Sequence, residues 1–165
     1  MNKQQQILKL IQSHKALEHF DYSYAVDWAI DLIRAGKDND NVLMLASFSK
    51  PYDRFEISPY VTAVLNDLGL EELDYKNAVI AEAHFYLTEI LNNNSIRKNL
   101  KYLYQLCIDN DYESGLMNFY LLYYAWDELE EIGVNYYFEG ADLDNIEDVL
   151  KSEARKWIQE NIDRK

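Results

Sequence analysis

Hydrophobic residues recur at helical spacing along nearly the whole chain, and few helix-breaking residues interrupt them. Ile96, Leu100, Leu103 and Cys107 follow one another in steps of four, three and four, which places them on one helix face. The 165 residues include only five glycines and two prolines, whereas an all-β domain needs such residues at many tight turns. The pattern therefore predicts an all-α fold.

Boundary signals divide this pattern into about eight helices. The expected helices cover residues 7–14, 25–32, 42–48, 59–68, 74–92, 96–107, 116–131 and 145–162. An antiparallel multi-helix bundle and a short HEAT-like stack of helical hairpins both satisfy this periodicity, so both arrangements stay open. Because no linker or low-complexity stretch interrupts the chain, we expect residues 1–165 to form a single all-helical domain.

Three boundaries are marked by specific residues. Ser58 followed by Pro59 is typical of an N-cap with proline at the first helical position, and Gly69 is expected to end that helix. Ser95 is expected to cap the helix that follows it. Gly133 is expected to end the helix over residues 116–131, because glycine readily adopts the left-handed conformation found there.

The same sequence indicates a cytoplasmic protein. The first ten residues contain charges and amides where a signal peptide needs an unbroken apolar stretch. No run approaches the roughly 18 apolar residues of a membrane span, so we expect no membrane association. The single Cys107 cannot form an internal disulfide.

Negative charge is concentrated in one quarter of the chain. The chain has 29 acidic and 16 basic residues, a net charge of −13. Residues 109–148 hold no Lys, Arg or His, and they hold twelve acids: Asp109, Asp111, Glu113, Asp127, Glu128, Glu130, Glu131, Glu139, Asp142, Asp144, Glu147 and Asp148. The remainder is nearly balanced, with 17 acids against 16 bases. This distribution argues against nucleic acid or an anionic membrane as the partner, since both require clustered Lys and Arg.

Catalytic and metal-binding motifs do not emerge from the sequence. His14 and His19 are five residues apart, about 140° around a helix, so they cannot share a metal as an i, i+4 pair does. Glycine-rich phosphate loops and nucleophile elbows are missing as well. We therefore expect no catalytic residue, no cofactor and no metal. A small enzyme with a pocket near His84 and Glu82 is one alternative, since histidine can act as a general base.

The acidic quarter is also rich in aromatic residues, which suggests a surface for a partner. Tyr136 and Tyr137, with Glu139 and Asp142, are the expected contact residues, because interfaces favour aromatic anchors within a charged rim. The acids expected to steer a basic protein toward this surface are Asp127, Glu128, Glu130 and Glu131. In the opposing interpretation the aromatic residues pack inward and the acids form a solvated face.

One stretch resembles a known group of proteins. Trp28-Ala29 with Leu32 and Gly36, then Leu43, Leu45-Ala46 and Phe55-Glu56, resembles the openings of small all-helical bacterial proteins encoded near polymorphic toxins, often called immunity proteins. The resemblance covers about a quarter of the chain. It implies stoichiometric inhibition of a toxin, often a basic nuclease, and it implies no particular binding residue.

The sequence thus favours a non-enzymatic cytoplasmic binding protein, of immunity type, that occludes a basic protein partner through an acidic, tyrosine-rich surface. A structural helical-repeat scaffold protein is the first alternative, and the small enzyme near His84 is the second. The sequence does not indicate an oligomeric state.

Overall fold

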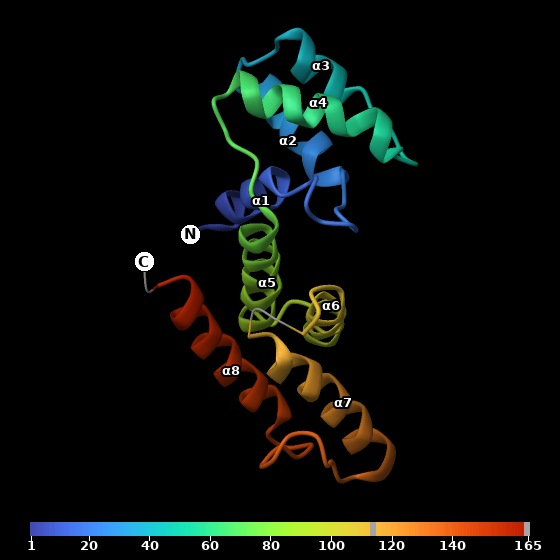
Figure 1. Ribbon diagram of the computed structural model, residues 1–165, viewed down its shortest axis with the longest axis vertical. Helices are drawn as coiled ribbons and strands as arrows, with labels where there is room; N and C mark the ends of the chain where they lie inside the picture. The colour runs from blue at the N-terminus through green and yellow to red at the C-terminus, as the bar shows by residue number, and fades with distance from the viewer. Residues whose placement is uncertain (113–114, 164–165) are drawn as a thin grey trace. The chain divides into compact units, whose positions relative to one another are not determined.

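The computed structural model describes residues 1–112 and 115–163. Within these residues the chain forms eight α-helices and no strand, which confirms the all-α prediction (Figure 1). Residue contacts divide the chain into two compact units, Met1–Ala81 and Glu82–Lys165. We describe each unit by itself, and the prediction of one domain over residues 1–165 stays a prediction.

The first unit is built around three successive helices that pack on one another. It contains α1 (Lys3–Gln12), α2 (Ser23–Arg34), α3 (Asp40–Ala46) and α4 (Arg54–Asp67), and α3 packs against both α2 and α4. Their apolar faces form a core whose most buried members include Ile11, Ala25, Ala29, Val42, Leu45, Ile57, Val61, Val64 and Leu65. This burial of apolar surface is the main stabilising contribution to the unit.

The start of α4 differs from the prediction. The helix begins at Arg54 rather than at Pro59, because Asp53 caps it by accepting hydrogen bonds from the backbone N–H groups of Phe55 and Glu56, at 2.7 and 3.2 Å. Pro59 lies inside the helix, where it donates no hydrogen bond to the carbonyl four residues before it. The prediction that Ser58 caps the helix is therefore wrong. The end of α4 is confirmed, because Leu68 is its C-cap and Gly69 follows with φ +68°.

The second unit places α7 between two neighbouring helices. Figure 1 shows α6 (Ile96–Asp109), α7 (Met117–Ile132) and α8 (Ile146–Asn161) in yellow to red, with α8 running back antiparallel to α7. Helix α7 packs against both α6 and α8. The side chains that these helices bury include Leu100, Leu103, Cys107, Phe119, Leu122, Trp126, Leu129, Leu150 and Trp157. Helix α5 (Tyr75–Leu91) carries the chain from the first unit into the second.

Of the predicted helix boundaries at Gly133 and Ser95, the first is confirmed and the second differs in its capping. Gly133 ends α7 as predicted, with φ +79° and its N–H donated to the Leu129 carbonyl at 3.0 Å. Ser95 does precede α6, but it adopts a left-handed conformation and makes no capping hydrogen bond through its side chain. The side-chain amide of Asn99 instead reaches back to the Asn94 carbonyl, at 2.7 Å.

Replacing Asp53 with Ala tests where α4 begins. We expect Asp53→Ala to lower the free energy of unfolding by about 0.5–2 kcal/mol, because two N–H groups lose their acceptor. Urea unfolding followed by circular dichroism measures the change. Asp27→Ala removes an exposed acid from within α2 and is the matched control. A cost no larger than that of Asp27→Ala would show that Asp53 does not hold the start of α4.

Candidate interaction surface and the buried His14 network

Tyrosines on one face of α7 make ring contacts with one another and with tyrosines of α6 and of the adjoining loops. We call this group the tyrosine cluster, and its members are Tyr104, Tyr112, Tyr120, Tyr123, Tyr124 and Tyr137. The ring of Tyr104 on α6 lies 4.2 Å from that of Tyr123 and 5.3 Å from that of Tyr120, centroid to centroid and nearly parallel. The cluster therefore joins α6 to α7 through ring contacts of favourable geometry.

Two hydroxyl groups of the tyrosine cluster, those of Tyr104 and Tyr120, have a raised pKa. The oxygens of Tyr104 and Tyr124 share a hydrogen bond of 3.0 Å. That hydrogen bond, helped by burial and by neighbouring hydroxyls, raises the pKa of Tyr104 to about 12. Burial and the neighbouring Tyr124 raise the pKa of Tyr120 as well. Tyr104 and Tyr120 therefore add polar hydroxyls to this face without adding charge.

The two tyrosines predicted to contact a partner have different surroundings. Tyr136 is 85 % exposed, and its backbone N–H donates to Oε2 of Glu128 at 3.0 Å. Tyr137 stacks on Tyr124 with 5.3 Å between ring centroids, and 46 % of it stays exposed. The inward packing that the opposing interpretation expects thus occurs for one side of Tyr137 and not for Tyr136.

Asn135 and Asp142 hold the loop between α7 and α8. The side-chain oxygen of Asn135 accepts from the N–H groups of Tyr137 and Phe138, at 3.1 and 2.8 Å. The Oδ1 atom of Asp142 accepts from the N–H groups of Asp144 and Asn145, both at 2.9 Å. Asp142 therefore shapes the loop in addition to carrying charge. Sequence reasoning missed Asn135, although asparagine after Gly-Val is a turn-forming signal.

A base from outside the acidic quarter pairs with two of the predicted steering acids. The guanidinium of Arg97, near the start of α6, contacts Oδ1 of Asp127 at 2.6 Å and Oε1 of Glu130 at 2.9 Å. It also lies 4.6 Å from the ring centroid of Trp126. We call this group the Arg97 clamp. It reduces the local negative charge, and of the four predicted steering acids only Glu128 and Glu131 have no ion pair among the described residues.

The remaining acids of this quarter lie at the surface. Glu113 falls outside the described residues, and the other eleven are exposed apart from Glu128, which is half-buried. Glu147 and Asp148 occupy the first turn of α8, where negative charge suits the helix dipole. Glu139 is exposed in the loop after α7, and it follows Tyr136 closely in the sequence.

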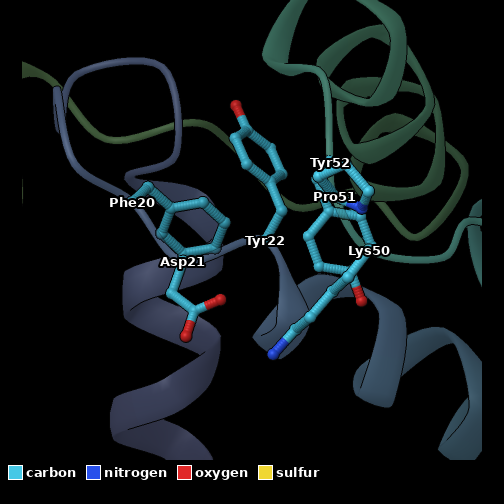
Figure 2. Close-up of a pocket in the computed structure, with 6 residues that line it drawn as sticks. All are labelled: Phe20, Asp21, Tyr22, Lys50, Pro51 and Tyr52. Atoms are coloured by element: carbon cyan, nitrogen blue, oxygen red, sulfur yellow. The ribbon is translucent and has the colours of Figure 1, made fainter.

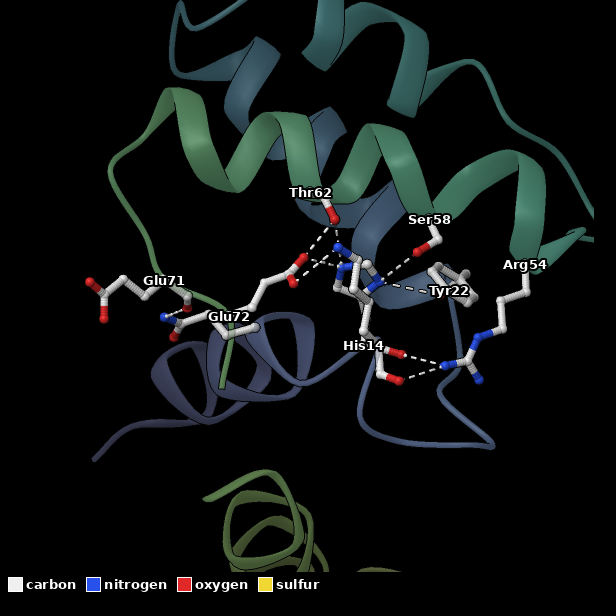
Figure 3. Close-up of polar contacts among 9 residues, drawn as sticks. His14, Tyr22, Arg54, Ser58, Thr62, Glu71 and Glu72 are labelled. Carbon is white, nitrogen blue, oxygen red and sulfur yellow. Dashed lines mark hydrogen bonds and ion pairs between the residues drawn. The ribbon is translucent and has the colours of Figure 1, made fainter. Parts of the chain in front are cut away.

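A second polar group lies around His14 in the first unit (Figure 3). The imidazole is completely buried, and its Nδ1 atom lies 3.2 Å from the Tyr22 hydroxyl and 3.3 Å from Oγ of Ser58. Its Nε2 atom lies 3.0 Å from Oε1 of Glu72. The hydroxyl of Thr62 also donates to that Glu72 oxygen. His14 thereby connects the turn after α1 to α2, α4 and the segment that follows α4.

Arg54 reinforces the same turn. Its guanidinium donates to the carbonyls of His14 and Lys15 at 3.2 and 2.9 Å, and to those of Leu17 and Glu18 at 3.1 and 2.9 Å. These bonds satisfy carbonyls beyond the end of α1 that no helix partner reaches. The arrangement fixes the segment from which Phe20 and Tyr22 extend.

The His14 network contains the three groups of a catalytic triad: a hydroxyl on Ser58, an imidazole on His14 and a carboxylate on Glu72. The imidazole has no exposed surface, however, and its Nδ1 atom is shared between Ser58 and Tyr22. A base must reach the proton that it removes in a bound substrate. We therefore interpret the His14 network as structural.

Burial sets the ionisation of His14. Loss of solvent is the largest influence and lowers the pKa of His14, against the hydrogen bond and the charge of Glu72, which raise it. The cations of Lys15 and Arg54 lower it further. Burial raises the pKa of Glu72, but hydrogen bonds from Thr62, Lys15 and His14 more than offset this, so its pKa is lowered. The network thus holds a neutral imidazole beside a carboxylate.

His84 and Glu82, the residues of the enzyme alternative, do not converge. His84 is 8 % exposed on α5, and burial lowers its pKa. Oε1 of Glu82 accepts from the Tyr86 hydroxyl at 2.8 Å. Residues two positions apart point about 200° apart around a helix, so this pair does not form an acid–base site by itself.

Comparisons with known proteins do not indicate a function. The chain matches no family model, and no curated protein or solved structure is significantly similar to it. Among the described residues, no group of three or more His, Cys, Asp and Glu side chains is placed to hold a metal ion. The described helices also include none with both the length and the apolar character of a membrane span.

The stability of the first unit should fall as the pH falls below His14's ordinary pKa of 6.5. In that range the unfolded chain binds a proton at His14 that the folded chain does not, so the free energy of unfolding decreases. Hydrogen-exchange protection of residues 54–67, measured between about pH 7.5 and 5.5, reports this unit alone. His14→Gln should flatten the dependence, and His19→Gln, at an exposed site, should not.

The pH prediction can be tested even if His14→Gln does not fold. Nuclear magnetic resonance titration of the unaltered protein gives the pKa of the His14 imidazole directly. A value above 6.5 would contradict the prediction, because stability would then rise on acidification.

The Arg97 clamp gives a prediction for the second unit. Arg97→Met keeps an apolar side chain on Trp126 but removes both ion pairs, and we expect it to lower the free energy of unfolding by about 1–2 kcal/mol. The loss should shrink in high salt, which screens the acids left unpaired. Urea unfolding at low and high salt measures both effects. Arg155→Met, at an exposed position of α8, is the control. An equal loss at both salt concentrations would exclude an electrostatic role.

Proposed function

We propose that this chain is a cytoplasmic, non-enzymatic binding protein that occludes a basic protein partner through the C-terminal end of α7 and the loop that follows it. We call the surface the acidic tyrosine surface, and it comprises Asp127, Glu128, Glu130, Glu131, Tyr136, Tyr137, Glu139 and Asp142. The observation that carries the proposal is Tyr136, a large aromatic side chain 85 % exposed within an acidic loop.

The exposed residues around Tyr136 supply the two things that an interface needs. Ile132, Val134 and Leu143 are 58 %, 51 % and 53 % exposed, so apolar surface accompanies the aromatic ring. Contact area of this kind holds a complex together when it is buried. The surrounding charge of one sign accelerates the encounter with a partner of the opposite sign. A solvated acidic face alone would not require exposed apolar residues.

The Arg97 clamp shows how such a surface can hold an arginine. One guanidinium contacts two carboxylates and at the same time covers the ring of Trp126. Glu128 near the end of α7 offers a carboxylate and Tyr136 in the following loop offers an aromatic face, and the backbone N–H of Tyr136 donates to Oε2 of Glu128 at 3.0 Å. We infer that an arginine of the partner would bind there in the same manner.

The resemblance to immunity proteins adds the purpose of such binding. If the partner is a toxin with a basic active surface, then the acidic tyrosine surface inhibits it by covering that surface at a ratio of one to one. Acidic side chains and tyrosine rings suit this purpose, because nucleic-acid sites present cations and stacking surfaces.

Site-specific photo-cross-linking identifies the partner. A photoreactive phenylalanine analogue at position 136 should cross-link, in the source cells, to a protein of net positive charge. The same analogue at position 55 is the control, since Phe55 is 89 % exposed in the first unit. An acidic partner, or equal cross-linking from both positions, would contradict the proposal.

The purified partner then allows a kinetic test. Glu139→Gln should lower the association rate constant and reduce its dependence on salt, while the dissociation rate changes little. Tyr136→Ala should mainly raise the dissociation rate, because it removes buried contact area. Glu18→Gln, at an exposed acid of the first unit, controls for net charge alone. Rates that respond equally to Glu139→Gln and Glu18→Gln would exclude a specific steering role.

A further inference from the structure

An open pocket of about 500 Å³ lies in the first unit, and its lining includes no residue of the acidic quarter. Two short segments line it: Phe20, Asp21 and Tyr22 between α1 and α2, and Lys50, Pro51 and Tyr52 between α3 and α4. Its volume lies within the range of about 300–1,000 Å³ that is usual for small-molecule sites. The predictions from the sequence did not include any of these residues.

The aromatic walls of the pocket are fixed before any ligand binds. The rings of Phe20 and Tyr22 meet edge to face, 4.8 Å between centroids. The Tyr22 hydroxyl lies 3.2 Å from the buried His14 imidazole, and Tyr52 packs against the apolar core of the unit. A ligand would therefore lose little affinity to ordering of these rings, because the fold already holds them.

Two opposite charges accompany the aromatic walls. Figure 2 shows the carboxylate of Asp21 and the ammonium of Lys50 on the same side of Tyr22. Among the described residues neither forms an ion pair within 4.0 Å, although Oδ1 of Asp21 accepts from the Ser23 N–H at 2.9 Å. Both groups are exposed, and each can bind a ligand group of opposite charge.

We propose that this pocket binds a free α-amino acid with an aromatic side chain. Such a molecule carries its ammonium and carboxylate on one carbon atom, which matches two opposite charges on one side of the site. Asp21 would accept from the ammonium, and Lys50 would donate to the carboxylate. The aromatic side chain would lie against the half-buried rings of Phe20 and Tyr52, beside the small part of Tyr22 that stays exposed, and edge-to-face and offset contacts are favourable there.

The experiment compares four small molecules on the full-length protein by ¹⁵N nuclear magnetic resonance. L-Phenylalanine carries all three features, 3-phenylpropionate lacks the ammonium, phenethylamine lacks the carboxylate and glycine lacks the ring. We expect L-phenylalanine to shift the amides of residues 20–22 and 50–52 saturably, with a dissociation constant of about 0.1–1 mM. Each of the other molecules should bind at least about fivefold more weakly.

Two variants separate the two charges. Asp21→Asn keeps an acceptor for the Ser23 N–H and should weaken L-phenylalanine and phenethylamine at least about fivefold, leaving 3-phenylpropionate unchanged. Lys50→Met should weaken L-phenylalanine and 3-phenylpropionate to a similar degree, leaving phenethylamine unchanged. Lys37→Met, at another exposed lysine of the unit, should have no effect.

Three results would overturn the proposal. The first is the lack of a saturable shift up to about 20 mM L-phenylalanine, a concentration far above that expected for half-saturation. The second is binding of L-phenylalanine that neither Asp21→Asn nor Lys50→Met weakens, which would mean that neither charged side chain contacts the ligand. The third is an effect of Lys37→Met as large as that of Lys50→Met, which would indicate nonspecific attraction to net charge.

Discussion

Burial of apolar helix faces is the interaction on which this molecule depends, and in the second unit it must outweigh a repulsive term. Twelve acids lie between Asp109 and Asp148 without a base among them in the sequence. The described acids avoid the interior, while Leu122 and Phe119 are at most 1 % exposed. Repulsion between charges in water is far weaker than in an apolar interior. The acids therefore lie at the surface, where their mutual repulsion destabilises the fold least, and the surface there has a negative electrostatic potential.

The tyrosines make this arrangement workable. A helix apolar on all sides would need cover on all sides, whereas α7 presents rings whose hydroxyls can face water. Tyr104 and Tyr124 bond to each other, which keeps both polar atoms satisfied without a charged partner. The Arg97 clamp then removes part of the repulsion at the end of α7 where Asp127 and Glu130 lie. The surface of α7 thus has three parts. One packs against the hydrophobic core, one presents tyrosine hydroxyls, and one is paired with the Arg97 guanidinium of α6.

Periodicity in the sequence predicted most of the helices, because a helix face is a local property repeated every three or four residues. Gly133 was predictable for the same reason, since a helix end depends on adjacent residues. The predicted start of α4 at Ser58-Pro59 was wrong. Proline is common at the first helical position, but Asp53 is the residue that caps α4. Arg97 and Asp127 are 30 positions apart, and His14 and Glu72 are 58 positions apart. Such partners meet only through tertiary packing, which a single sequence does not reveal.

The polar groups around His14 and the solvated acids of the second unit have opposite roles, and this contrast bears on where a protein partner would bind. Among the described residues no buried side-chain nitrogen or oxygen lacks a hydrogen-bond partner, and around His14 every polar group is committed to holding the fold. Glu131 and Glu139 instead face solvent. Charge that remains solvated governs the rate of encounter more than the strength of a complex. In the proposed complex the affinity would then come from surface that is still uncovered, which in the second unit includes Tyr136, Ile132 and Val134.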